Sequence, residues 1–161
     1  MTLLLFVLDV YKWQARRGKY FLHEHPWTAT SWRVEEVQEL LQRSGVEAVR
    51  GDSCQYGMRV TDADGQSRAA RKATGWMSNA PMLLEELSAR CQGLCGQHAD
   101  LKNGRAAQTA IYPPELCTAI IRGLQRQWEA DRVELAPEIV AAVRSEEDER
   151  ATEIGQVDDP D

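Results

Sequence analysis

The sequence predicts an α/β protein, and three observations support this class. Apolar residues recur at helical spacing near the start, a short aromatic-rich strand pattern follows between glycine and proline, and helical and strand patterns then alternate along the chain. The 161 residues include 43% hydrophobic and 27% charged residues, which are ordinary values for one globular domain with a single core. We therefore expect helices layered on a sheet, in a unit shorter than a full doubly wound enzyme.

The first predicted elements are a helix over residues 2–15 and a strand over residues 20–25. Gly18 is a plausible stop for the helix, and Gly18 and Pro26 delimit the strand. The apolar face of the helix consists of Leu4, Val7, Leu8 and Tyr11.

A second helix and a second strand follow. Apolar residues at helical spacing over residues 34–41 predict the helix, which opens near Ser31 and closes at Gly45. Period-two alternation over residues 46–50 predicts the strand.

Two short strands are then expected around residues 57–61 and 71–77, joined by the turn sequence "DADG". Pro81 suits the first turn of the helix that comes next. The remaining predicted segments are a helix ending near residue 90, a loop over 91–112, a helix over 113–128 and a last helix from Pro137.

The net charge of −6 conceals an uneven distribution. Residues 128–161 carry 12 acidic and 3 basic side chains, whereas residues 1–127 carry 13 acidic and 16 basic ones. Acidic blocks of this kind are typical of solvated or disordered segments. We expect an α/β part over residues 1–127 and an acidic helical or disordered tail over 128–161. The acidic whole-chain balance is therefore no argument against nucleic-acid binding by residues 1–127.

The apolar runs are short, and the longest covers only residues 3–8 before Asp9. A membrane span needs about 20 apolar residues, and no signal-peptide pattern surrounds this run. We expect no membrane association and an intracellular location, cytoplasmic or nuclear. In a reducing compartment the four cysteines are free thiols or metal ligands.

The segment "CQGLCGQH" predicts a metal site. Cys91, Cys95 and His98 have the spacing C-x3-C-x2-H, and thiolates and imidazole are the ligands that Zn²⁺ prefers. Gly93 and Gly96 would let this loop wrap around a metal ion. Two buried free cysteines in a glycine-rich loop are the alternative interpretation. Three residues are candidates for a fourth ligand: Cys117, Cys54 and His23.

Three segments occur in a fixed order: "KYFLHEHPW", "CQYGMRV" and "ARKATGWMSN". Together they resemble the C-terminal half of the catalytic core of cytosine-C5 DNA methyltransferases, in the divergent form found in phage and retrotransposon polyproteins. The resemblance covers about residues 3–125. It implies a partial Rossmann-like, class I methyltransferase-like half-domain with a helical C-terminal part.

The resemblance also implies roles for three residues. Glu24 takes the position of the glutamate that hydrogen-bonds a flipped cytosine on its Watson–Crick edge. Arg71 and Lys72 fall where the family has basic residues that contact phosphate or the base oxygen. His25 stands where the family has asparagine.

Two family features have no counterpart in this sequence: the glycine-rich loop that holds S-adenosylmethionine, and a cysteine after proline as the nucleophile. The resemblance therefore implies a mobile-element-derived fragment that is catalytically incomplete alone. S-adenosylmethionine would bind only together with an upstream half, and that half or other polyprotein segments would be its partners.

Two other functions are expected on the residues themselves. Arg16, Arg17, Lys19 and Trp27 combine basic and aromatic groups, as in modules that bind DNA or RNA or another partner. The same residues are also common on ordinary solvated surfaces. The third hypothesis is a small zinc-stabilised structural domain.

Overall fold

The computed structural model describes residues 2–102 and 104–132. Residues 1–127 and 128–161 form two units, and the sheet belongs to the first. The tail over 133–161, including the helix expected from Pro137, lies outside the described residues.

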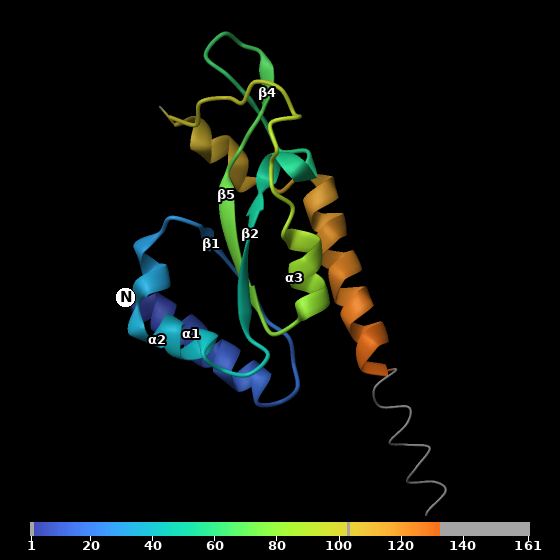
Figure 1. The fold of residues 1–161 in the computed structure, drawn as a ribbon. Helices are drawn as coiled ribbons and strands as arrows, with labels where there is room; N and C mark the ends of the chain where they lie inside the picture. Colours follow the sequence, from blue (N-terminus) through green and yellow to red (C-terminus); the bar gives the residue numbers. More distant parts are fainter. Residues whose placement is uncertain (1, 103, 133–161) are drawn as a thin grey trace, which may run out of the picture. The chain divides into compact units, whose positions relative to one another are not determined.

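A three-stranded sheet forms the centre of the first unit (Figure 1). Its strands are β1 (Leu22–Pro26), β5 (Ala73–Ser78) and β2 (Glu47–Asp52), in the spatial order β1-β5-β2. Both outer strands pair antiparallel with β5, and Trp76 of β5 stands opposite Glu24 on one side and Val49 on the other. Among the strands of the described residues, the last in sequence is thus the central one of this sheet.

The predicted mixed α/β class is confirmed, but the strands do not run as a Rossmann-like half-domain requires. That fold is built on parallel strands joined by helical crossovers. In this protein the pairing in the described part of the sheet is antiparallel. The described residues therefore show an α/β architecture without a Rossmann arrangement.

Helices α1 (Thr2–Ala15) and α2 (Glu35–Leu41) pack on one face of the sheet, as Figure 1 shows in blue and cyan. The residues buried in this layer are apolar: Leu8, Phe21, Val37, Leu40, Val46 and Met77. The opposite side of α1 is also apolar and is exposed, with Leu3, Phe6, Val10 and Trp13 in a row.

The end of α1 confirms the predicted stop at Gly18. Gly18 has φ +63°, and its N–H donates to Ala15 O at 3.1 Å. Lys19 N–H donates to Gln14 O at 3.0 Å. This pair of hydrogen bonds is the Schellman motif, which requires a left-handed residue that glycine adopts without strain.

The other face of the sheet is covered by α3 (Pro81–Leu87) and by a helix that begins at residue 114 (green and orange in Figure 1). The expected helix over 113–128 is thus observed, with described helical residues 114–132. The buried residues of this layer are Tyr56, Trp76, Ala80, Leu83, Leu84, Leu87, Leu116 and Ala119.

A separate hairpin, β3 (Arg59–Thr61) and β4 (Ser67–Ala69), flanks the "DADG" turn. The sequence predicted that a strand over 71–77 follows the turn after 57–61. In the structure β4 follows the turn and pairs with β3, and β5 is a separate strand of the larger sheet. The described residues also include three short 3-10 helices: η1 (Thr30–Arg33), η2 (Ser53–Tyr56) and η3 (Arg105–Ala110). None of the described helices is both long enough and apolar enough to span a lipid bilayer.

Candidate metal centre

Four side chains from two distant parts of the chain meet at one point. Cys54 lies on η2, directly after β2, and Cys91 and Cys95 lie on the loop that follows α3. His98 forms a parallel β-bridge with Ala69, the last residue of β4. Their candidate ligand atoms all lie within 4.8 Å of one another.

The distances among these atoms suit a tetrahedral ion. Cys91 Sγ and Cys95 Sγ are 3.2 Å apart, and His98 Nε2 lies 3.5 Å from Cys91 Sγ and 3.2 Å from Cys95 Sγ. With Zn–S near 2.3 Å and Zn–N near 2.0–2.1 Å, the edges of a tetrahedron around zinc measure about 3.5–3.8 Å. A small outward shift of each ligand would admit the ion. Three thiolates and one imidazole form a closed donor set, which is typical of structural zinc sites.

Both glycines of the loop have left-handed backbone conformations. Gly93 has φ +86° and Gly96 has φ +75°, and both values favour glycine over any residue with a Cβ. Gly93 N–H points at Cys91 Sγ, at 3.4 Å. A main-chain donor to sulfur stabilises a thiolate, so the turn prepares Cys91 as a ligand.

Among the three candidates for the fourth ligand, the structure selects Cys54. Cys117 is exposed on the helix that begins at residue 114. His23 is buried on β1, where its Nδ1 lies 3.4 Å from Tyr11 Oη. Burial lowers the pKa of His23 with help from the neighbouring His25.

Cys54 and Cys91 experience different environments. Burial raises the pKa of the Cys54 thiol to about 12. The Gly93 N–H and the Cys95 thiol lower the pKa of Cys91. A bound cation would supply the charge that favours the thiolate of Cys54, because a coordinating thiol is deprotonated by the metal.

A buried carboxylate adjoins the candidate metal centre. Asp52, at the end of β2, has no exposed side-chain surface and accepts a hydrogen bond from Cys91 N–H at 3.0 Å. Burial alone would raise the pKa of Asp52, but the Cys91 N–H and the guanidinium groups of Arg50 and Arg71 outweigh it and hold the pKa below its usual value. Asp52 was not among the predicted site residues. Its position at the end of a strand, two residues before a cysteine, is the signal that could have found it.

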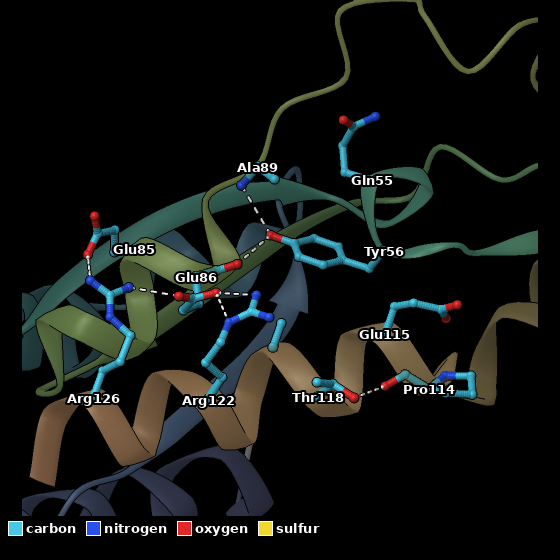
Figure 2. Close-up of a pocket in the computed structure, with 11 residues that line it drawn as sticks. Gln55, Tyr56, Glu85, Glu86, Ala89, Pro114, Glu115, Thr118, Arg122 and Arg126 are labelled. Carbon is cyan, nitrogen blue, oxygen red and sulfur yellow. Dashed lines mark hydrogen bonds and ion pairs between the residues drawn. The ribbon is translucent and has the colours of Figure 1, made fainter. Parts of the chain in front are cut away.

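Tyr56 fixes the two segments that carry the cysteines (Figure 2). Its hydroxyl donates to Glu86 O at 3.0 Å and accepts from Ala89 N–H at 3.1 Å. The η2 segment with Cys54 is therefore tied to the end of α3, just before Cys91.

A cavity of about 630 Å³ lies beside Tyr56, between α3 and the helix from residue 114. Figure 2 shows the residues that line it. Ion pairs occupy one side of it. Glu86 accepts from Arg122 Nε at 2.8 Å and from Arg126 Nη1 at 2.7 Å, and Arg126 also pairs with Glu85 at 2.7 Å. These pairs join the two helices and leave few unpaired polar groups to recognise a ligand.

The residues assigned from the methyltransferase resemblance are divided between two sites. Lys72 Nζ lies 3.2 Å from Glu24 Oε1, so these two form an ion pair across β1 and the start of β5. Arg71 instead faces Asp52, with Nε 3.7 Å from Oδ2. Glu24 is thus partly neutralised by a lysine of the same chain.

The residues proposed for nucleic-acid contact are also separated. Arg16, Arg17 and Lys19 lie between the end of α1 and the start of β1, whereas Trp27 follows the other end of β1. The guanidinium of Arg17 lies 4.2 Å from the ring centre of Trp13, where it forms a cation–π contact.

Comparison with protein-family models, with curated proteins and with solved structures finds no match for this chain. The geometry of the site is therefore the basis for a functional proposal.

Proposed function

We propose that this protein is a small zinc-stabilised domain, in which one Zn²⁺ is held by Cys54, Cys91, Cys95 and His98. The observation that carries the proposal is the convergence of these four ligand atoms within 4.8 Å from segments far apart in the chain. Softer thiolate donors favour Zn²⁺ over Mg²⁺ or Ca²⁺, which prefer oxygen ligands. The closed donor set supports a structural role for the ion.

The ion would join parts of the fold that share only a small apolar core. The loop over residues 91–104 contains no helix or strand of its own in its described residues, and its core contacts are limited to Ala99 and Leu101 against Met58, Val60 and Ala70. Metal coordination would bind this loop to η2 and β4. Structural zinc contributes directly to folding free energy in such small cores.

The test is a metal titration of the full chain. We expect one zinc per chain after purification, a fall in Tm on chelation, and recovery when Zn²⁺ is restored. Co²⁺ in place of zinc should give the absorption bands of a tetrahedral thiolate site. Cys95→Ser should abolish stoichiometric binding.

Cys117→Ser is the matched control, because Cys117 is exposed and lies outside the cluster. This variant should bind one zinc with unchanged Tm. In a thiol-labelling assay the zinc-loaded protein should expose one rapidly reacting cysteine, and all four should react after chelation and denaturation. Zinc-free protein with an unchanged Tm in the presence of a chelator would contradict the proposal.

The methyltransferase-like origin stays a prediction that rests on the three sequence segments alone. Its Rossmann-like half-domain, S-adenosylmethionine and the missing upstream half belong to that prediction. Two results would support it. A longer chain that contains this segment should bind S-adenosylmethionine, and its transfer of a methyl group to cytosine should be lost in Glu24→Gln.

A further inference from the structure

Three arginine side chains converge on the single buried carboxylate of Asp52. Arg50 Nη2 lies 2.9 Å from Oδ1, while Arg90 Nε and Arg71 Nε lie 3.4 and 3.7 Å from Oδ2. The side chains of Arg71 and Arg90 are 45% and 51% exposed, whereas that of Asp52 is fully buried. Asp52 therefore holds two guanidinium groups that also face solvent.

The charges in this cluster do not cancel. Three guanidinium groups surround one carboxylate, and a zinc ion on three thiolates and one imidazole would add one further negative charge. A positive charge is left over even with the metal bound. Within residues 2–102 and 104–132, the only carboxylate paired with Arg71 or Arg90 is Asp52, and it faces their Nε atoms. Their terminal Nη groups are therefore available as a fork of donors.

An aromatic surface adjoins the cluster. Gly75 of β5 stands opposite His25 on β1 and opposite Arg50 on β2, so cross-strand neighbours at this position share one face of the sheet. The indoles of Trp27 and Trp32 cover Gly75 on that face, because a Cβ there would meet both rings. Trp27 is 40% exposed, and the strand register places Arg50 on the same face of the sheet.

We propose that Arg71 and Arg90, held by Asp52, bind the phosphates of a single-stranded nucleic acid whose base stacks on Trp27. Guanidinium forks match the geometry of phosphate oxygens, and an exposed aromatic face accepts any base by stacking. The combination of a fork and a stacking ring favours a nucleic-acid strand over a free phosphate or an acidic peptide. The site does not depend on which metal fills the neighbouring centre.

A binding assay tests the inference. The zinc-loaded full chain would be titrated into a fluorescein-labelled single-stranded oligonucleotide of mixed sequence. Fluorescence anisotropy would be measured over a range of salt concentrations, with DNA and RNA strands as separate arms. Arg71→Gln with Arg90→Gln should weaken binding at least tenfold and lower the salt slope by about 1–2, since two phosphate contacts are lost. Trp27→Leu should weaken binding about fivefold or more with the salt slope unchanged.

The matched control is Arg43→Gln with Arg132→Gln, which removes the same charge from two exposed residues outside the arginine cluster and should leave affinity within twofold. If the Gln pair is destabilised, Arg71→Lys with Arg90→Lys keeps both charges while removing the fork, and it should also weaken binding. Tm would be measured for every variant. The inference would be overturned if the control pair lost as much affinity as the Arg71 and Arg90 pair, or if Trp27→Leu bound with unchanged affinity. It would also be overturned if polyaspartate displaced the oligonucleotide as well as unlabelled nucleic acid does, or if no binding occurred at low salt.

Discussion

The main-chain N–H of Cys91 donates a hydrogen bond of 3.0 Å to the buried Oδ2 of Asp52. This contact ties the loop of the metal centre to the last residue of β2, next to η2 and Cys54. Asp52 thereby serves two neighbouring features, the proposed zinc site and the arginine cluster. Changes at Asp52 should consequently affect metal affinity and stability together.

Asp52→Asn tests this connection. The amide keeps the size of the side chain but removes its charge, which leaves three guanidinium groups without a counter-charge. We expect the free energy of unfolding to fall by about 1–3 kcal/mol, because charge-assisted hydrogen bonds to Asp52 are lost while the arginines stay partly solvated. Zinc affinity should fall about tenfold or more, because groups that position metal ligands have effects of this size.

Urea denaturation and competition with a chromogenic chelator would measure the two quantities. Asp64→Asn, in the exposed turn between β3 and β4, is the control and should change neither. Unaltered zinc affinity in Asp52→Asn would show that the charge of Asp52 does not influence the metal centre.

Glu86 should make stability depend on pH. Its hydrogen bond from Arg122, together with that from Arg126, holds the pKa of this carboxyl below its ordinary value of 4.5. Because the folded-state pKa is lowered, the ionised side chain stabilises the fold above its ordinary pKa. That contribution is lost as pH falls through the folded-state value.

Glu86→Gln should therefore lower the free energy of unfolding at pH 7 by about 1–3 kcal/mol. The difference between the two proteins should shrink below about pH 4. Urea denaturation across this range measures it, and the exposed Glu47→Gln serves as control. A difference that stays constant down to acid pH would contradict the assignment of these ion pairs.

Two glycines of the sheet should tolerate alanine differently. A Cβ on Gly75 would lie 2.5 Å from Cζ2 of Trp32, and one on Gly51 would lie 2.3 Å from the main-chain O of Leu87. Gly75→Ala should cost about 1–3 kcal/mol, since the indole must move. Gly51→Ala should cost more, because a carbonyl of α3 cannot rotate away.

A double-mutant cycle provides the check. Trp32→Leu should recover much of the loss in Gly75→Ala, as measured by thermal and urea unfolding, but none of the loss in Gly51→Ala. Additive losses of stability for Gly75→Ala and Trp32→Leu would show that a clash with the Trp32 ring is not the cause of the loss in Gly75→Ala.

Several features of this chain follow from local sequence. The helix over 2–15 and its end at Gly18 follow from apolar spacing and from the left-handed conformation that glycine adopts easily. The grouping of Cys91, Cys95 and His98 also follows, because a loop of this length with two glycines can close on itself. Each of these features depends on residues within a few positions of one another.

Tertiary structure alone decided the direction of the strands, the fourth metal ligand and the arginine cluster. Apolar alternation identifies a strand but carries no information on its partner, so the antiparallel pairing of β1 and β2 with a central β5 could not be derived from it. That pairing brings Cys54 and Asp52 beside Cys91. Contacts between residues so distant in sequence depend on how sheets and helices pack, which no local pattern specifies.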